Sequence, residues 1–341
     1  MKYSVLYACN EAYSPFAGVS IHSLLSSNRD AEEIDIYLVT DEVSEKTLQK
    51  LQSEVGSFGA GRRLLVVDAA PYIREMQAGI IPMYRGSYTT NLRLFFEKFI
   101  QPDCERLLYL DCDIVLAGSL AGLFSANLGE APAAGVQESI AGVYPYEIGF
   151  SAGDPYFNAG VFFIHVPNWK KQHCTERLFE MMNDPRHRYM NPDQDLLNIL
   201  LKNRVHWLLP QYNLQPAHLA YSDRAYFRRY GKECYYSKEE IDFSRKNPVI
   251  YHTYRFCGQF PWHKNSVHPA REIWLKNKAE SVFADHPPVP NKGAIFVVER
   301  ALYRLLPRSV FLWIFSLAQR QQFRAAEKRM QKELRAKEKQ G

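Results

Sequence analysis

The sequence has no apolar run long enough to cross a membrane. A spanning helix needs roughly 20 consecutive apolar residues, and the longest candidate, Val310–Ala318, is far shorter. A signal peptide is not indicated either, because the apolar segment Tyr3–Cys9 is short and polar Asn10 and Glu11 follow it directly. We therefore expect a cytoplasmic protein and interpret Tyr3–Cys9 as a first β-strand.

The sequence also has no C-x-x-C pair. Its cysteines are Cys9, Cys104, Cys112, Cys174, Cys234 and Cys257. A chain of 341 residues is long enough to fold around a hydrophobic core without a disulfide framework. We expect all six cysteines to be reduced thiols.

Net charge is nearly absent from most of the chain. The formal charge is +5, but residues 300–341 carry 11 Lys and Arg against 3 Glu, so residues 1–299 have a net charge of −3. The positive charge therefore belongs to the C-terminal segment and not to the main fold. Hydrophobic residues make up 46% and charged residues 23% of the chain, which excludes collagen-like, low-complexity and wholly disordered classes. No nucleic-acid partner is expected.

Strand and helix patterns alternate along the first part of the chain. Predicted strands cover 3–9, 34–39, 64–67, 107–110, 133–136, 160–166 and 249–252. Predicted helical segments cover 13–26, 42–53, 88–100, 177–183 and 194–202. Repeated strand–helix units indicate an α/β fold with a doubly wound, mostly parallel sheet. Ligands of such sheets bind beyond the carboxyl ends of the strands, so polar residues that follow strands are candidate site residues.

The pair Asp111 and Asp113 follows the apolar strand 107–110. In extended backbone, side chains two residues apart point to the same face, and two carboxylates suit one divalent cation. The D-x-D pattern is common by chance, and Asp193 with Asp195 forms a second example. Apolar runs on both sides of Asp111 and Asp113 favour a metal site, since carboxylates in such surroundings need a partner. The alternative is a turn cap and a surface aspartate.

Three further groups of residues lie at the ends of predicted strands or helices. Asn158, Ala159 and Gly160 precede a strand, where small residues let the backbone approach a ligand. Asp193 and Gln194 open a helix, and Asp193 alone is also consistent with an N-cap. His252 ends the last predicted strand, a position that favours a functional role over a structural one.

The order and spacing of these segments resemble the retaining nucleotide-sugar glycosyltransferases of family 8, which include glycogenin and bacterial lipopolysaccharide galactosyl- and glucosyltransferases. The resemblance covers about residues 3–265. The matching segments are Tyr7–Tyr13, Asn91–Leu94, Leu108–Asp113, Phe157–Gly160, Asn168-Trp169, Asp193–Asp195, and His252 with Gly258 and Pro261-Trp262.

The resemblance implies a GT-A type fold with a small second sheet and a helical C-terminal extension. It also implies that Asp111, Asp113 and His252 bind Mn²⁺, with Mg²⁺ as the alternative ion, and that the metal holds the diphosphate of a UDP-sugar. A set of two carboxylates and one imidazole agrees with the ligand preferences of Mn²⁺. The donor site implied by family position comprises Ala8, Cys9, Asn10, Tyr13, Arg93, Cys112, Asn158, Ala159 and Gly258.

The implied reaction is transfer of a hexose, glucose or galactose, to a saccharide or glycolipid acceptor in bacterial surface glycan synthesis. The resemblance places Asp193 and Gln194 at the hexose, as the catalytic pair, and Glu138 near it. Because a neutral amide is a poor nucleophile, we favour attack by the acceptor on the face from which UDP leaves. A covalent intermediate on Asp193 is the alternative mechanism.

The sequence departs from the family pattern where a lysine normally grips the diphosphate before Pro261-Trp262. Phe260 occupies that position, and the segment that follows His252 is two residues longer than in some members. Arg255 and Lys264 are therefore the candidate replacements.

The domain prediction has three parts: residues 1–265 as the GT-A catalytic domain, 266–290 as a helix and Pro-rich linker, and 291–341 as a basic amphipathic helical tail. Within the tail, apolar residues of 299–318 lie among several arginines. This pattern favours attachment to the anionic inner face of the plasma membrane. A dimerising or solvated helix is the alternative, and the oligomeric state is left open.

Two other functions are consistent with parts of the sequence. Residues 149–153 match the G-x-S-x-G pattern of α/β-hydrolases, with Ser151 as nucleophile and Asp193 and His252 following in the expected order. Asp154-Pro155 directly after the pattern disfavours the helix that such a nucleophile requires. A non-catalytic sugar-nucleotide binding module is the other alternative.

Overall fold

A computed structural model of the chain describes residues 1–78, 83, 87–139, 150–151, 154–183, 191–230, 236–291, 293–315, 317, 318, 321 and 325. The strands are β1 (Lys2–Asn10), β2 (Glu33–Asp41), β3 (Arg62–Asp68), β4 (Arg106–Leu110), β5 (Ile114–Leu116), β6 (Ala133–Gly135), β7 (Val161–His165), β8 (Val205–Trp207) and β9 (Ile250–His252). The helices are α1 (Ser14–Ser27), α2 (Glu45–Gly56), α3 (Ala70–Ala78), α4 (Ala121–Phe124), α6 (Val166–Lys171), α7 (Cys174–Met182), α8 (Pro192–Leu200), α9 (Pro216–Ala220), α10 (Asp223–Tyr230), α11 (Lys238–Lys246), α12 (Arg271–Glu280) and α13 (Ala294–Leu305), with 3₁₀ segments η1 (Thr89–Lys98) and η2 (Pro210–Tyr212).

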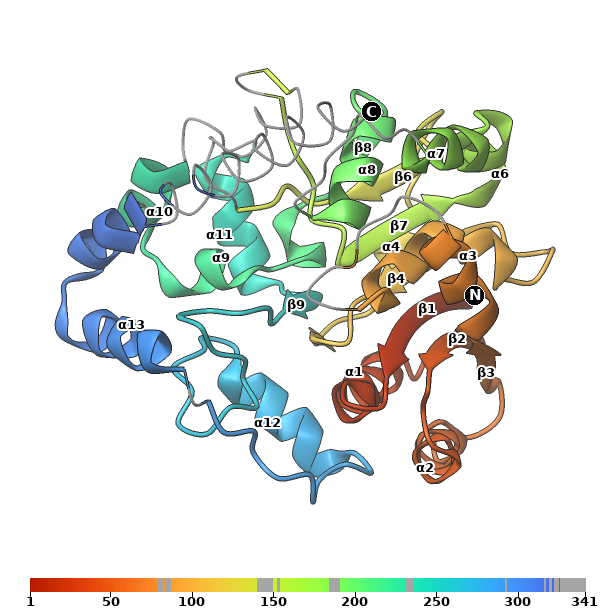
Figure 1. The fold of residues 1–341 in the computed structure, drawn as a ribbon, viewed down its shortest axis with the longest axis horizontal. Helices are drawn as coiled ribbons and strands as arrows, with labels where there is room; N and C mark the ends of the chain where they lie inside the picture. The colour runs from red at the N-terminus through yellow and green to blue at the C-terminus, as the bar shows by residue number, and fades with distance from the viewer. Residues whose placement is uncertain are drawn as a thin grey trace, which may run out of the picture.

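The main sheet has seven strands in the order β3-β2-β1-β4-β7-β6-β8, and Figure 1 shows it running from β3 at the lower right to β8 at the top. The first four strands in this order are mutually parallel, with Val5 opposite both Ile36 and Leu108. Strand β7 is antiparallel to both β4 and β6. The mostly parallel sheet is therefore confirmed.

The sheet is buried on both faces, which explains its nearly continuous apolar strands. Along β1, Tyr3, Val5 and Tyr7 belong to one core cluster, while Leu6 and Ala8 belong to another on the opposite face. The alternation follows from the two-residue period of a strand. The first cluster packs α1, α2 and α12, and the second packs η1, α7 and α8.

A second, two-stranded sheet pairs β5 with β9 in antiparallel register. Ile114 lies opposite His252, and the backbone N–H of Thr253 donates to the carbonyl of Asp113 at 2.7 Å. The small second sheet is therefore confirmed. It places the end of β9 beside the turn that carries Asp111 and Asp113.

The segment predicted as helical over 88–100 differs in detail from the expectation. It is a 3₁₀ helix, η1, and its 10 residues are unusually long for this class. Leu92, Phe95 and Phe96 are buried in the core cluster beneath it. Tertiary packing of these side chains outweighs the poorer hydrogen-bond geometry of the 3₁₀ form.

The described C-terminal residues form two helical pieces separated by a break before Pro307, namely α13 and residues 308–315. Phe311 is buried, and Tyr303 packs against both Phe311 and Phe256 in edge-to-face contacts. The apolar residues of this segment are therefore divided between the core and the surface. None of the described helices is both long enough and apolar enough to cross a bilayer.

Candidate active site

A cavity of about 540 Å³ opens beyond the carboxyl ends of β1 and β4. This is the edge of a parallel sheet where ligands bind, because polar loops meet there above a rigid core. The lining residues are Ala8, Cys9, Asn10, Tyr13, Ser87, Thr89, Thr90, Arg93, Tyr109, Asp111, Cys112, Asp113, Glu138, Asn158, Asn191, Asp193, Gln194, His252, Tyr254, Arg255 and Phe260.

Asp111, Asp113 and His252 converge on one wall of this cavity. Nε2 of His252 lies 3.3 Å from a carboxylate oxygen of Asp113 and 4.0 Å from one of Asp111. One ligand atom from each residue lies within 4.8 Å of the others. Two hard oxygen donors and an imidazole form a donor set that fits Mn²⁺ or Mg²⁺.

Gly160 lets the side chains of His252 and Asp111 pack directly over its backbone. A Cβ atom at this position would lie 2.3 Å from Cε1 of His252 and 2.6 Å from a carboxylate oxygen of Asp111. The Gly160 carbonyl also accepts from the backbone N–H of Asp111 at 2.9 Å. A side chain at position 160 would therefore displace His252 or Asp111, while the predicted approach of the Asn158–Gly160 backbone to a ligand stays a prediction.

The two aspartates affect the pKa of His252. Burial disfavours the charged imidazolium, but the carboxylates of Asp113 and Asp111 overcome this effect and raise the pKa of His252 above its ordinary value. The same two carboxylates would favour a cation bound beside His252.

Arg93 connects the candidate metal site to Asp193. Its Nε lies 2.8 Å from Asp193, and one terminal nitrogen donates to Asp111 at 2.8 Å. Another terminal nitrogen donates to the Ala159 carbonyl, and the guanidinium lies over the Tyr109 ring with its carbon 4.2 Å from the ring centroid. Arg93 is buried and its donors point at protein atoms. It therefore positions two carboxylates, and because it also lines the cavity, its predicted contact with the donor stays a prediction.

Asp193 lies in the first turn of α8, two residues after the N-cap residue Asn191. It is buried, and its partner is the guanidinium of Arg93, so the N-cap interpretation is wrong. Burial raises the pKa of Asp193, and the Arg93 charge limits that rise. The result is a fixed hydrogen-bond acceptor at the cavity wall.

The Gln194 side chain is held in one orientation. Its Oε1 accepts from the backbone N–H of Ala159 at 2.8 Å, and its Nε2 donates to the hydroxyl of Tyr156 at 3.1 Å. Ala159 therefore acts through its backbone, which orients Gln194 and Arg93, and its side chain is not among the lining residues.

The end of β1 lines the other part of the cavity. Asn10 Oδ1 accepts from the backbone N–H of Tyr13 at 3.1 Å, and the Cys112 thiol donates to the Ala8 carbonyl at 3.3 Å. Tyr13 exposes 42% of its surface, so its ring is available to a flat ligand. Cys9 and Cys112 are buried free thiols, as predicted.

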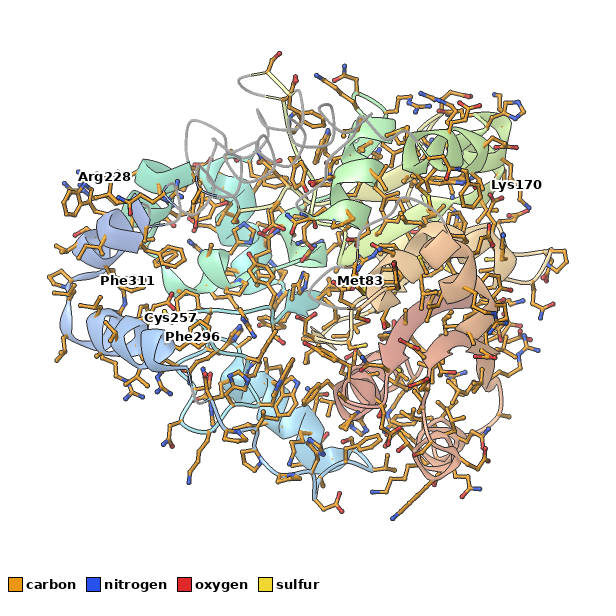
Figure 2. All side chains as sticks on the ribbon, in the orientation of Figure 1. Met83, Lys170, Arg228, Cys257, Phe296 and Phe311 are labelled. Carbon is orange, nitrogen blue, oxygen red and sulfur yellow. The ribbon has the colours of Figure 1, made fainter. Side chains whose placement is uncertain are left out.

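Gly258 does not belong to the cavity lining. Its φ is +66°, and a Cβ there would clash with the Phe296 ring of α13 at 1.9 Å. Cys257 and Phe296 appear side by side in Figure 2. Gly258 is thus required for close packing against the C-terminal helix. Of the two replacements for the expected lysine, Arg255 lines the cavity and Lys264 does not.

Sequence reasoning missed several lining residues. The sequence signal for Tyr109 is its position two residues before Asp111 in extended backbone, which places both side chains on one face. In the structure, the Tyr109 hydroxyl donates to Asp111 at 2.9 Å. Thr89 and Thr90 lie shortly before Arg93 on η1. Tyr254 lies two residues after His252, and its hydroxyl donates to Glu138 at 3.3 Å.

The geometry contradicts the hydrolase alternative. The His252 nitrogens face Asp113 and Asn213, and Asp193 pairs with Arg93. In the described part of the chain, the pairing of His252 with Asp193 that would activate Ser151 is therefore not formed. Ser151 is exposed, and its N–H donates to Asp154 at 2.7 Å. Gly149, Ala152 and Gly153 of the motif lie outside the described residues.

A family model described as "Glycosyl transferase family 8" matches residues 4–266. The chain is 24% identical to the lipopolysaccharide 1,3-galactosyltransferase of Salmonella typhimurium, over 82% of this chain and 79% of that protein. It is 26% identical to a lipopolysaccharide 1,2-glucosyltransferase of Escherichia coli, over 89% of this chain and 85% of that protein.

Solved structures share the fold. One of them is a crystal structure of the galactosyltransferase LgtC in complex with donor and acceptor sugar analogues, with a TM-score of 0.62 and 22% sequence identity. The match covers 82% of this chain and 96% of that chain. This likeness confirms the predicted GT-A type fold.

The requirement for glycine at position 160 can be tested by adding a methyl group there. Gly160→Ala is expected to weaken Mn²⁺ binding by roughly tenfold or more, because the added methyl displaces His252 or Asp111. The affinity is measured by titrating the protein with Mn²⁺ and recording the electron paramagnetic resonance signal of the free ion.

Gly56→Ala is the matched control, because a Cβ there meets no atom within 4 Å. It should bind Mn²⁺ like the unmodified protein. Equal Mn²⁺ affinity in the Gly160→Ala and Gly56→Ala proteins would show that the three side chains do not hold the ion.

Proposed function

The chain belongs to glycosyl transferase family 8, and from this we propose that it moves glucose or galactose from a UDP-sugar to a saccharide acceptor with retention of anomeric configuration. The acceptor is a growing surface glycan of the lipopolysaccharide type, made at the cytoplasmic face of the membrane. The names of the two bacterial relatives, a galactosyl- and a glucosyltransferase of lipopolysaccharide, support both donors.

The observation that carries the proposal is the convergence of Asp111, Asp113 and His252, which the absence of a side chain at Gly160 permits. These residues would hold Mn²⁺ at one end of a cavity large enough for a nucleotide sugar. When bound, the ion supplies positive charge that stabilises the diphosphate as it departs.

Arg255 is the residue we assign to the diphosphate in place of the expected lysine. It is exposed on the cavity wall, and its guanidinium carbon lies 5.4 Å from the centroid of the Phe260 ring. The cation–π contact holds the guanidinium over the cavity rim. A guanidinium in this position suits a diphosphate because it donates two parallel hydrogen bonds.

Asp193 and Gln194 form the hexose subsite in this proposal, with Asn158 beside them. Arg93 holds Asp193 as a fixed acceptor for sugar hydroxyls. The Ala159 N–H and the Tyr156 hydroxyl orient the Gln194 amide, whose oxygen dipole stabilises positive charge that develops at the anomeric carbon. Glu138, bonded to Asn158, borders the same subsite.

The proposed reaction is attack of the acceptor hydroxyl on the face from which UDP leaves. The acceptor oxygen forms the new bond to the anomeric carbon as the bond to the β-phosphate oxygen breaks, and that oxygen takes the acceptor proton. Gln194 is too weak a nucleophile for a covalent route. Asp193 is held by Arg93, which disfavours its attack on the sugar.

The C-terminal surface supports contact with an anionic membrane. Several large apolar side chains are exposed there, with arginines nearby, and Figure 2 shows Arg228 on the same side of the molecule as Phe311. The exposed set is Val297, Val298, Leu305, Val310, Trp313 and Leu317. Apolar residues beside cations are typical of interfacial binding.

The donor is tested by measuring UDP release from a panel of UDP-hexoses, with Mn²⁺ and with a chelator. Metal-dependent release from UDP-glucose or UDP-galactose is expected, and the chelator should reduce it by roughly a hundredfold or more because the ion stabilises the departing charge. Binding without release would indicate a non-catalytic module, and release unaffected by the chelator would contradict the metal site.

Arg255→Ala is expected to raise the KM for the UDP-hexose by roughly tenfold, since one charge-assisted pair of hydrogen bonds is lost. Steady-state kinetics with UDP as the measured product give the change. Lys264→Ala is the control, because Lys264 is exposed outside the cavity lining. If the two variants behave alike, Arg255 does not bind the diphosphate.

Membrane contact is tested by co-sedimentation with vesicles of phosphatidylcholine and phosphatidylglycerol. Trp313→Glu and Leu305→Glu should each weaken binding by about tenfold, which corresponds to the loss of one buried apolar side chain, and added salt should release the protein. Val66→Glu on β3 changes an exposed valine away from this surface and serves as control. Unchanged binding of both tail variants would refute the proposal.

A further inference from the structure

A fully buried asparagine, Asn213, lies directly behind His252. It follows η2 and has no exposed surface. Its neighbour Leu214 donates its N–H to the carbonyl of Ile250 at 2.8 Å, and its carbonyl accepts from the N–H of His252 at 3.1 Å. The backbone of Asn213 is therefore tied to β9 next to the histidine.

The Asn213 side chain contacts two residues of the proposed active site. Its Oδ1 lies 3.1 Å from Nδ1 of His252, and its Nδ2 donates to Oδ1 of Asn158 at 3.0 Å. Asn158 Nδ2 in turn donates to the carboxylate of Glu138. Four side chains thus form one continuous chain of hydrogen bonds, from His252 through Asn213 and Asn158 to Glu138.

The direction of this chain follows from its fixed members. Asn158 Oδ1 accepts from the backbone N–H of Gly160 at 3.1 Å, and a backbone N–H can only donate. The other end of the Asn158 amide must then donate, and the Glu138 carboxylate is there to accept. This settles which end of Asn158 is oxygen without reference to the histidine.

The orientation of the Asn213 amide then decides which ring nitrogen of His252 carries a proton. The Asn213 atom that faces Asn158 Oδ1 has to be a donor, so it is the nitrogen. The atom that faces His252 is then the carbonyl oxygen, which can only accept. Nδ1 of His252 therefore carries a proton, and the lone pair of the neutral ring lies on Nε2, the nitrogen that faces Asp111 and Asp113.

We propose that Asn213 is a positioning residue that fixes His252 with its proton on Nδ1 and so presents Nε2 to the divalent cation. The proposal rests on the proposed function, because it assumes that His252 is a metal ligand. Metal-binding histidines commonly have their second ring nitrogen held in this way, and removal of such a partner typically weakens metal binding 10- to 100-fold. Asn213 also orients Asn158, so one buried side chain aligns the metal site and the hexose subsite.

Two variants separate the two contacts of Asn213. Asn213→Leu has a similar volume and removes both hydrogen bonds. Asn213→Asp keeps an acceptor toward His252 but removes the donor toward Asn158. Asn28→Leu is the matched control, because Asn28 is also fully buried and bonds on both sides, to the Leu24 carbonyl and the Leu120 N–H.

The measurement is the affinity for Mn²⁺ in the presence of UDP, together with electron spin-echo spectroscopy, which detects nitrogen directly coordinated to the bound ion. Asn213→Leu should weaken Mn²⁺ binding roughly 10- to 100-fold and lose the nitrogen signal at saturating Mn²⁺. Asn213→Asp should retain that signal and show its main defect as a raised KM for the UDP-hexose. Asn28→Leu should lower thermal stability with the nitrogen signal intact.

The outcomes distinguish this proposal from the proposed function. An unmodified protein that binds no Mn²⁺ with UDP and releases no UDP would overturn both. A protein that shows the nitrogen signal and turns over UDP-hexose, but is unaffected by Asn213→Leu, would overturn the positioning role alone. Equal loss of the nitrogen signal in the Leu and Asp variants would also overturn it.

Discussion

The antiparallel pairing of β5 with β9 is the constraint on which the site depends. This short ladder places His252 opposite Ile114 and therefore beside Asp113, although the two segments are far apart in the sequence. The carboxylates and the imidazole would be costly to bury separately, and their proximity creates a strong local demand for a cation. The family assignment identifies a hexosyltransferase, and the donor set fits the divalent ion that we propose at this point.

Some residues around the site are placed to contact a ligand, and others position those residues. Arg93 lies buried between Asp111 and Asp193 and aligns both. Gly160 contributes only the absence of a side chain. Asn213 contributes two hydrogen bonds that set the orientation of neighbouring groups. A preorganised arrangement of this kind favours catalysis because little reorganisation is needed when charge develops.

Sequence patterns predicted seven of the nine described strands, the D-x-D pair and the glycine-containing segment, because these depend on local periodicity and on position after a strand. They did not predict the short strands β5 and β8. The position of His252 after a strand marked it as a candidate, and the family resemblance added its role as a metal ligand. Its proximity to Asp113 depends on a ladder that periodicity does not encode. Asn213 was not predicted, since an asparagine after a 3₁₀ turn has no distinctive pattern. Gly258 packs against the Phe296 ring of a distant helix, a constraint that no local pattern reveals. Within the tail, Phe311 packs inward, and the sequence alone does not separate it from its exposed apolar neighbours.

The central claim is that one ion lies between Asp111, Asp113 and His252. Crystals grown with UDP and Mn²⁺, with diffraction data collected at the manganese absorption edge, test it most directly. The account predicts a single strong anomalous peak in the cavity, bordered by both carboxylates and by Nε2 of His252. A peak at another site, or His252 turned away from the ion, would contradict it.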